Sequence, residues 1–383
     1  MRDIVILSAA RTPIGSFQGA LSSLSAPQLG GQVLKGAAER ADVEPASLDH
    51  VYMGCVLPAG IGQAPARQAA FEAGCTASTG AITLNKVCGS GMRTVMSAAN
   101  DLRCGEFDLV AAGGMESMSN APYLLPDARG GQRLGHGQLI DSMIHDGLWD
   151  PYGDKHMGNC AETCAARYEF DRESQDAYAQ RSYELAQEIV PVAVPQRRGE
   201  PLQIDSDEEP ARANFAKMVK LRPAFQRDGG TVTAANASKI NDGAAALILT
   251  TAEHAEKVGA RPIARLVSQA TFSHEPEWFT TAPVQAIGKA LDKAGLQASD
   301  VDLFEINEAF AVVAMAAIQD LGLEREKVNV RGGAIALGHP IGCSGARILV
   351  TLLHALVESG GRYGCAGICL GGGEATSVVV ERL

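Results

Sequence analysis

The feature that most constrains what this 383-residue chain can fold into is an internal repeat. Residues 27–51 resemble residues 283–303, and both segments are typical of a helix followed by a short loop and a strand. Residues 88–93 in turn resemble residues 342–347, and each of these begins a helix-length segment. The offset between matching segments changes by only a few residues, which small differences in loop length can absorb. The chain is therefore predicted to contain one structural unit twice.

Each half alternates short apolar runs, such as residues 4–9 and 51–56, with segments of helical pattern. This alternation predicts a layered α/β structure. Residues 119–239 have no counterpart in the second half, and their acidic, basic and proline-containing runs set them apart. Residues 241–250 are again apolar, so we expect the chain to return there to the sheet of the first half.

A chain of this length exceeds the size at which a single core usually stops growing, so we expect more than one domain. We predict an N-terminal half of residues 1–118 plus 240–262, an inserted loop domain of residues 119–239 and a C-terminal half of residues 263–383. Within the insert, residues 211–227 carry five basic side chains and no acidic one. This segment is equally typical of a phosphate contact and of an ordinary exposed helix and loop.

Composition narrows the classes of function. The net charge of -11 and the pI near 5.3 argue against wholesale nucleic-acid binding, which needs a basic face. The first ten residues do not resemble a signal peptide and no later segment suggests a membrane span, so we expect a cytoplasmic protein without a membrane partner. The nine cysteines include no paired Cys-x-x-Cys motifs that would suggest zinc, and Cys160 and Cys164 are expected to pack in the core.

Cys88 lies between the apolar residues 81–84 and a helix-like run that starts at Met92. A cysteine at such a turn faces the unpaired N–H groups and the positive dipole end of the helix, which favour the thiolate. This position makes Cys88 a candidate nucleophile. The alternative is a buried structural cysteine, which is the commoner role of an unpaired cysteine.

Three further loops each place a reactive group among glycines or other small residues. His339 lies between glycines that let other backbone approach closely, and we interpret it as a base rather than a structural histidine. Asn307 and Glu308 follow an apolar strand, where active-site groups of α/β folds gather, although they could instead cap the next helix. Cys369 also follows an apolar strand and precedes three glycines, which makes a purely structural role less convincing.

Taken together, these groups resemble the motifs of the thiolase family, in the same order and at similar separations. The motifs are Cys88, Asn-Glu-Ala-Phe at 307–310, Gly-His-Pro at 338–340 and Cys-Leu-Gly-Gly-Gly at 369–373. The likeness runs nearly end to end, through further motifs at residues 113–117, 156–158, 220–225 and 230–243. So many independent motifs do not coincide by chance, and the resemblance favours Cys88 as the nucleophile.

The resemblance implies the thiolase fold, an α/β structure in which two duplicated halves form a five-layered α-β-α-β-α core beneath an inserted loop domain that covers a coenzyme A site. It also implies an acyltransferase that condenses two acetyl-CoA into acetoacetyl-CoA and CoA, or runs the reverse thiolysis, through an acetyl-cysteine intermediate. No cofactor beyond the substrate coenzyme A and no metal is expected. Residues 123–149 resemble the loop by which short-chain thiolases assemble, so we expect a homotetramer, a dimer of dimers.

The resemblance assigns catalytic roles to five residues. Cys88 takes the acetyl group, and His339 is the base that removes its proton. Cys369 is the acid and base at the α carbon of the second acetyl-CoA. His339 and a water held by Asn307 stabilise the enolate oxygen, while the backbone N–H groups of Cys88 and Gly371 form a second oxyanion hole.

The coenzyme A contacts carry over less directly, because the insert is the least regular segment. The resemblance places Lys220 and Arg222 near the phosphates and Ser238 near the pantetheine amide. Around the acyl and pantetheine ends it places Leu148, His156, Met157 and Phe310. Two residues depart from the commonest family pattern: Cys343, which we expect to pack in the core, and Glu374, which can alter a neighbouring pKa or simply face solvent.

Two alternatives stay open. The first is a degradative 3-ketoacyl-CoA thiolase of broader chain length, because chain-length choice depends on pocket shape, which sequence predicts poorly. The second is a thiolase-like acyl-CoA binding protein without turnover, since a fold alone does not establish activity. The intact Cys88, Asn307, His339 and Cys369 disfavour this second alternative. A ketoacyl synthase is also disfavoured, because that related family uses two histidines where this chain has Cys369 as its second base.

Overall fold

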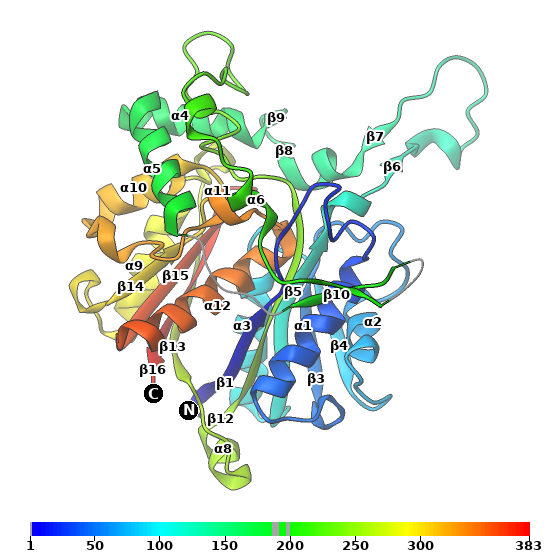
Figure 1. Cartoon of the computed structure of the whole chain (residues 1–383), viewed down its shortest axis with the longest axis vertical. Coiled ribbons are helices and arrows are strands. Elements are labelled where there is room, and N and C mark those ends of the chain that lie inside the picture. The colour runs from blue at the N-terminus through cyan, green and yellow to red at the C-terminus, as the bar shows by residue number, and fades with distance from the viewer. Residues whose placement is uncertain (1, 186–190, 197–199) are drawn as a thin grey trace.

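The computed structural model describes residues 2–185, 191–196 and 200–383, and within them one hydrogen-bonded sheet of ten strands dominates (Figure 1). The first half supplies β1 (Ile4–Arg11), β2 (Gly15–Ser16), β3 (His50–Gly54), β4 (Gly80–Leu84), β5 (Leu109–Ser117) and β12 (Asn241–Thr251). The second half supplies β13 (Ala264–Ser273), β14 (Leu303–Ile306), β15 (Tyr363–Leu370) and β16 (Glu374–Arg382).

Strand order confirms the internal repeat. The sheet runs β14-β15-β16-β13-β1-β12-β5-β3-β4, so outward from its centre β1, β12, β5 and β3 match β13, β16, β15 and β14. In both halves the inner pairs are antiparallel and the outer pair, β5 with β3 or β15 with β14, is parallel. The halves join where Val5 and Ile6 pair with Arg265 and Ala264. As expected, residues 241–250 complete the first half's sheet, as part of β12.

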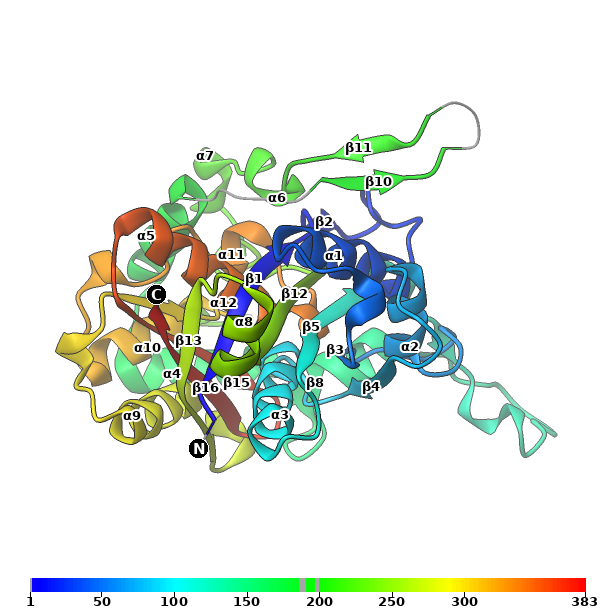
Figure 2. The ribbon, with the colours of Figure 1, turned by 90° about the horizontal axis from the view of Figure 1, so that it is seen from below.

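The strands of each half form one sheet layer, which we call a half-sheet. Helices form the three remaining layers, which confirms the predicted α-β-α-β-α core (Figures 1 and 2). Between the two half-sheets lie α3 (Ser90–Cys104) and α12 (Ile341–Ser359), which pack against each other and against strands of both halves. The outer face of the first half carries α1 (Ala26–Arg40) and α2 (Pro65–Glu72), and that of the second half carries α9 (Ala282–Ala294) and α10 (Ala311–Leu321). Two short helices, α8 (Ala252–Val258) and α11 (Ala334–Leu337), connect these layers.

The central helix α12 is apolar on all sides because both of its faces pack on strands. Among the described residues it is the one helix long and apolar enough to cross a membrane by length and composition, and 83% of its most apolar window is buried inside the protein. The expectation that no segment suggests a membrane span therefore overlooked α12. Its composition follows from its place between two sheets, where a polar stripe would lose its contact with water.

Glycine allows backbone to contact backbone where α12 crosses β5. A Cβ added at Gly114 would lie 2.0 Å from the carbonyl oxygen of Gly342, which belongs to the first turn of α12 and cannot rotate away. This contact brings the start of α12, and with it the loop that contains His339, close to the first half's sheet. The close approach of two layers thus depends on the absence of one side chain.

We expect Gly114→Ala to lower the free energy of unfolding by about 1–3 kcal/mol, because the added methyl group overpacks a rigid contact. The matched control is Gly288→Ala in α9, where an added Cβ meets nothing within 4 Å. That control should raise stability by about 0.5–1 kcal/mol, since alanine favours the helix over glycine. Urea unfolding of the two variants checks both signs, and equal stability of Gly114→Ala and the parent chain would contradict the backbone contact.

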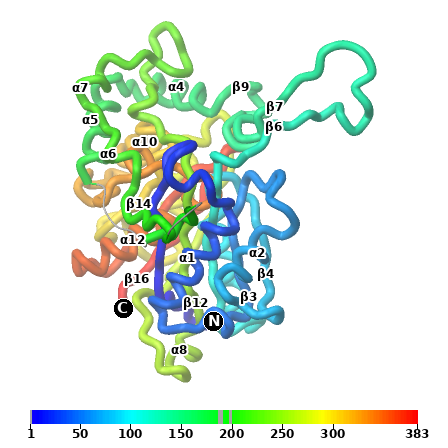
Figure 3. The backbone as a smooth tube through the Cα atoms, turned by 45° about the vertical axis from the view of Figure 1, so that its right-hand side comes forward, coloured from blue at the N-terminus to red at the C-terminus, as the bar shows by residue number. Residues whose placement is uncertain are grey.

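The insert is built from short elements. Its elements are β6 (Tyr123–Leu124), β7 (Ile140–Asp141), β8 (Trp149–Asp150), β9 (Lys155–His156), α4 (Met157–Tyr168), α5 (Arg172–Leu185), β10 (Val192–Val194), β11 (Leu202–Ile204), α6 (Glu208–Ala211) and α7 (Phe215–Met218). Helices α4 and α5 pack on α10, whereas the arm with β6 and β7 projects away from the body (Figure 3). The β10–β11 hairpin is tied to α1 by two bonds between the Gln32 side chain and the Ala193 backbone, at 3.0 and 3.2 Å.

Candidate active site

Cys88 lies on a strained turn between the end of β4 and the start of α3. Val87, just before it, has a φ of 45°, which is unfavourable for a β-branched residue. Asn85 Oδ1 holds this turn by accepting from the Val87 N–H at 2.9 Å. Ser90 Oγ accepts from the Lys86 N–H at 2.8 Å and donates to the Val87 carbonyl at 2.6 Å. The turn presents Cys88 directly before the first turn of α3, where the sequence predicted it.

The environment of the Cys88 sulfur disfavours the thiolate. Burial raises the pKa of the thiol to about 12, and the negative charge of Glu116 adds to this effect. The backbone N–H groups of Cys88 and Gly371 lower the pKa but do not outweigh burial. The backbone donors favour the thiolate, as expected of this position, but removing a charged sulfur from water costs more free energy than these donors return.

This pKa makes a testable prediction about alkylation. We expect the rate at which iodoacetamide alkylates Cys88 to keep rising with pH up to at least about pH 9, because the thiolate fraction grows until the pH reaches the raised pKa. Mass spectrometry of the Cys88 peptide separates this reaction from that of the exposed Cys104. A rate that levels off below pH 8 would show a preformed thiolate instead.

His339 is held in the bend between α11 and α12. Its backbone N–H donates to Asn241 Oδ1 at 3.0 Å. The preceding Gly338 has a φ of 111°, and a Cβ there would lie 2.4 Å from the Asn241 side chain, so only glycine fits. Gly338, one of the glycines that flank His339 in the sequence, is thus required by the contact between Asn241 and His339.

The hydrogen bonds of the imidazole define its tautomer. His339 Nδ1 lies 2.6 Å from Ser344 Oγ, and that hydroxyl donates its own hydrogen to the Pro340 carbonyl at 2.9 Å. With the Ser344 hydrogen directed at that carbonyl, Nδ1 carries a hydrogen and donates it to Ser344 Oγ, which leaves the lone pair on Nε2. Burial, together with the charge of Arg347, lowers the pKa of His339 to about 3. His339 Nε2 has no hydrogen-bond partner among the described residues, so the ring is a neutral base.

Cys369 lies near the end of β15 and is buried. Burial raises the pKa of its thiol well above the usual value, and the charge of Cys88 raises it further. Cys369 does not itself form part of the cavity wall described below. Cys365, four residues earlier on the strand, is fully buried and contacts Ser377 Oγ at 3.5 Å, as expected of a core cysteine.

Asn307 follows the last residue of β14 and is completely buried. Its Oδ1 accepts from Arg347 Nη2 at 3.4 Å, and its backbone N–H donates to the Gly367 carbonyl at 3.0 Å. Its Nδ2 has no partner among the described residues. Asn307 does not cap α10, whose N-cap is Phe310. The arrangement leaves one oriented amide donor in the protein interior, as a residue that holds a water would require.

A cavity of about 440 Å³ brings three of the five predicted catalytic residues together with most of the predicted substrate contacts, whereas Asn307 and Cys369 lie outside its wall. Cys88, His339 and Gly371 lie in its wall. So do the predicted contacts of the acyl and pantetheine ends, namely Leu148, His156, Met157, Ser238 and Phe310. At Gly371 an added Cβ would meet only ordinary contacts, at 3.5 Å or more, so the chain's own packing does not demand glycine there.

Aromatic rings form one side of this cavity. Phe225 stacks on His156 with 4.7 Å between ring centroids and meets Phe310 edge-on at 5.9 Å. Phe279 meets Phe310 at 6.4 Å. The walls are mainly apolar, with a few polar groups, which is typical of a site for a small organic ligand.

The two predicted phosphate contacts lie outside the cavity wall. Lys220 and Arg222 are exposed on the loop that leads to Phe225, so the structure does not bring them to the reactive groups. The cationic side chains in the wall are instead Arg212 and Lys239. Arg212 belongs to the basic segment noticed in the sequence. Lys239 directly follows Ser238, but no sequence signal indicated that it would reach the cavity.

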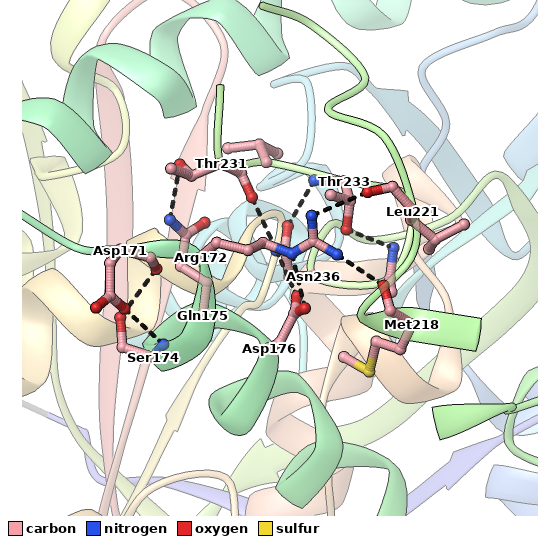
Figure 4. A network of polar contacts seen from close by, with 12 residues as sticks. Asp171, Arg172, Ser174, Gln175, Asp176, Met218, Leu221, Thr231, Thr233 and Asn236 are labelled. Atoms are coloured by element: carbon pink, nitrogen blue, oxygen red, sulfur yellow. Dashed lines mark hydrogen bonds and ion pairs between the residues drawn. The ribbon is translucent and has the colours of Figure 1, made fainter. Parts of the chain in front are cut away.

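The insert loop after α7 is fixed to α5 by a polar network (Figure 4). Arg172 donates from Nη1 to the Leu221 carbonyl at 3.0 Å and from Nη2 to the Met218 carbonyl at 2.6 Å. Asp176 accepts from Arg172 Nε at 2.7 Å and from Asn236 Nδ2 at 2.9 Å. The network binds Met218 and Leu221 at one end of the loop and Asn236 at the other end. It therefore holds the aromatic side of the cavity against α5.

Sequence reasoning missed Glu116, which links the halves beneath Cys88. This buried carboxyl group accepts from the N–H groups of Val56 at 3.0 Å, Leu57 at 3.2 Å and Gly342 at 2.8 Å. Burial raises its pKa to about 7 even though these donors lower it. The sequence feature that could have indicated Glu116 is the presence of a charged residue at the end of an apolar strand. Glu116 thereby connects β5 to the first turn of α12.

The two unusual residues have structural roles. Cys343 is buried in the core between the half-sheets, as expected. Glu374 forms an ion pair with Lys86 on the Cys88 turn and accepts from Ser273 Oγ at 2.9 Å. Glu374 therefore contacts the turn from the second half. Within the described part of the chain, no three His, Cys, Asp or Glu side chains form a group that could hold a metal ion.

Comparisons with known proteins agree with this geometry. The chain matches the model of the thiolase N-terminal domain over residues 4–253 and that of the thiolase C-terminal domain over residues 260–382. It is 53% identical to acetyl-CoA acetyltransferase 1 of Arabidopsis thaliana, over 99% of this chain and 94% of that protein. It is 47% identical to the acetyl-CoA acetyltransferase of Pseudomonas aeruginosa, over the full length of both. The crystal structure of the Acat5 thiolase from Ascaris suum in complex with coenzyme A superposes with a TM-score of 0.94, at 44% identity and full coverage of both chains. The chain therefore belongs to the thiolase family.

Proposed function

We propose that this chain is an acetyl-CoA acetyltransferase, which condenses two acetyl-CoA into acetoacetyl-CoA and CoA and catalyses the reverse thiolysis. The observation that carries the proposal is the pairing, in one cavity, of a half-buried cysteine thiol with an imidazole whose Nε2 lone pair has no hydrogen-bond partner among the described residues. The names of the curated relatives and the coenzyme A in the related crystal structure support the same substrate class.

Acetyl transfer to Cys88 begins from a neutral pair, because the thiol has a raised pKa and the imidazole a lowered one. Proton transfer to His339 Nε2 must therefore accompany attack of the sulfur on the thioester carbonyl. The new bond joins Cys88 Sγ to the acetyl carbon, and the bond to the coenzyme A sulfur breaks. The imidazolium returns its proton to that sulfur, and CoA leaves as a thiol. The N–H groups of Cys88 and Gly371 stabilise the oxyanion formed during attack.

Condensation needs a base at the methyl carbon of the second acetyl-CoA. The Cys369 thiolate takes that proton, and the resulting enolate carbon attacks the acetyl group on Cys88. The carbon–sulfur bond to Cys88 breaks and acetoacetyl-CoA forms, and the Cys88 thiolate that leaves receives the proton that Cys369 had removed, which restores the Cys369 thiolate. The Asn307 Nδ2 donor supplies stabilisation for the enolate oxygen, directly or through a water, and the His339 Nε2 lone pair orients such a water by accepting one of its hydrogens.

Chain length separates the proposal from a broad degradative thiolase. The experiment measures thiolysis of acetoacetyl-CoA and of straight-chain 3-ketoacyl-CoA substrates with longer acyl groups, following loss of the 3-ketoacyl-CoA absorbance. We expect kcat/KM to be highest for acetoacetyl-CoA and to fall as the chain lengthens. Equal or greater kcat/KM for long chains would favour the degradative activity, and no turnover of any substrate would favour a non-catalytic acyl-CoA binding protein.

The projecting arm supports a homotetramer, a dimer of dimers. It exposes large apolar side chains, among them Tyr123 at 65%, Leu134 at 99% and Leu139 at 65%. Such side chains on an extended arm are typical of a surface that another subunit covers. Light scattering coupled to size-exclusion chromatography tests this assembly, and a monomer would refute it. A cytoplasmic location belongs to the same proposal, and it fits the nine cysteines, which are all free.

A further inference from the structure

Lys239 places a cation in the cavity wall that the proposed reaction does not use. Its Nζ donates to the Tyr183 hydroxyl, to the Ile335 carbonyl at 2.6 Å and to the Ala237 carbonyl at 3.5 Å. It also lies 4.9 Å from the centre of the Tyr183 ring. An ammonium group has three hydrogens to donate, so this arrangement uses each of them on an oxygen atom.

The three oxygen atoms belong to three segments that meet at the active site. Tyr183 is on α5 of the insert. Ile335 is on α11, which continues through Gly338 into His339. Ala237 forms a bridge with Phe310, and the next residue, Ser238, donates its backbone N–H to the Ala309 carbonyl at 3.0 Å. Lys239 therefore lies where the insert, the His339 loop and the loop after Asn307 come together.

The Ile335 peptide is held from both ends. Its N–H donates to Glu308 Oε2 at 3.2 Å, and its carbonyl accepts from Lys239. Glu308 Oε2 also accepts from Ser182 Oγ at 2.7 Å, on the same helix as Tyr183. Four residues after Ile335, the His339 N–H is bound by Asn241, two residues after Lys239. The segment at 239–241 thus contacts the His339 loop at its start and at the histidine itself.

Burying the Lys239 ammonium group costs free energy unless an opposite charge lies nearby, because burial disfavours the charged form. Burial lowers the pKa of Lys239 to about 8, and the carboxylates of Glu209 and Glu308 raise it in partial compensation. A shorter neutral side chain would leave the Ile335 carbonyl and the Tyr183 hydroxyl without this donor.

We propose that Lys239 is a positioning residue, whose ammonium group fixes the His339 loop to the insert and so orients His339 toward Cys88. The inference rests on the proposed acetyltransferase activity for its kinetic test, and a second readout is independent of that activity. The side chain acts through the loop and does not need to touch the acetyl group.

The kinetic test compares Lys239→Ala, Lys239→Met and Lys257→Ala, an exposed lysine on α8 remote from the cavity. We expect kcat for thiolysis of acetoacetyl-CoA to fall about 10- to 100-fold in both Lys239 variants, because a displacement of about 1 Å in a catalytic group has an effect of this size. KM should change less than threefold, and Lys257→Ala should match the parent. Added n-propylammonium, which replaces the deleted carbons and nitrogen, should restore kcat in Lys239→Ala, whereas 1-propanol should not.

Unchanged kcat in Lys239→Met would overturn the proposal, because methionine keeps the volume without the charge. A loss confined to KM would overturn it too, since that result assigns Lys239 to substrate binding. The melting temperature supplies the readout without turnover: n-propylammonium should raise it in Lys239→Ala and leave it unchanged in Lys257→Ala. If the melting temperature does not shift, the positioning role of Lys239 is contradicted, whether or not the chain has acetyltransferase activity. If the shift is seen but the parent chain is inactive, only the proposed function is refuted.

Discussion

Cys88→Ala should abolish transfer of an acetyl group from acetyl-CoA to the protein and should lower thiolysis by at least about 10⁴-fold, the order of loss seen when an essential nucleophile is removed. The strained turn at Val87, the donors at Cys88 and Gly371 and the base at His339 all converge on this one sulfur atom. Mass spectrometry of the peptide that contains residue 88, after mixing with acetyl-CoA, measures the acetyl group directly.

The matched control is Cys104→Ala, the same substitution at the exposed last residue of α3. It should keep both acetylation of Cys88 and full turnover. Acetylation of another residue at the parent rate in Cys88→Ala would remove Cys88 from its role, as would substantial turnover of that variant.

Cys369→Ala should separate the two half-reactions. We expect condensation of acetyl-CoA to fall by about 10²- to 10⁴-fold, the usual contribution of a general acid or base, while Cys88 still accepts an acetyl group. The physical reason lies in the coupling of the two sulfur atoms. Burial raises the pKa of Cys369 well above its usual value, and a charge on Cys88 raises it further, so the two thiols do not ionise together. Acetylation prevents Cys88 from ionising and so removes the second of these two effects.

The experiment measures the acetylated Cys88 peptide and acetoacetyl-CoA formation in the same reaction mixture. Cys365→Ala is the matched control, because it removes a buried thiol from the same strand without touching the cavity. It should lower stability by a similar amount and leave condensation intact. Unchanged condensation in Cys369→Ala would show that another group removes the α proton. Loss of Cys88 acetylation in this variant would show that Cys369 acts before condensation.

The fold was largely predictable because it is repeated in the chain. Two copies of one pattern of apolar runs predict two similar sheets, and the strand order of β1, β12, β5 and β3 matches that of β13, β16, β15 and β14. The packing of α12 on β5 was less accessible, because it depends on backbone contacts such as that of Gly114 with Gly342, far apart in sequence. An isolated glycine in a strand does not indicate its contact partner.

The reactive groups of the candidate site were predictable from the sequence, whereas the charged residues that line its cavity were less so. Cys88, His339, Asn307 and Cys369 were recognisable because each is a reactive side chain in a distinctive short motif. Lys220 and Arg222 stay predicted phosphate contacts and lie outside the cavity wall, whose cationic side chains are Arg212 and Lys239. The path of the insert loop determines which of these cations reaches inward, and the network around Arg172 and Asp176 sets that path through contacts remote in sequence.

By itself, the sequence determined the duplicated α/β architecture, the family and the identity of the reactive groups, because these follow from local patterns and short motifs. Only the tertiary structure decided the protonation states of those groups. A helix N-terminus in the sequence favoured a Cys88 thiolate, but burial raises its pKa to about 12, and burial with Arg347 lowers that of His339 to about 3. Desolvation depends on every atom packed around a charge, including atoms of residues far away in the sequence.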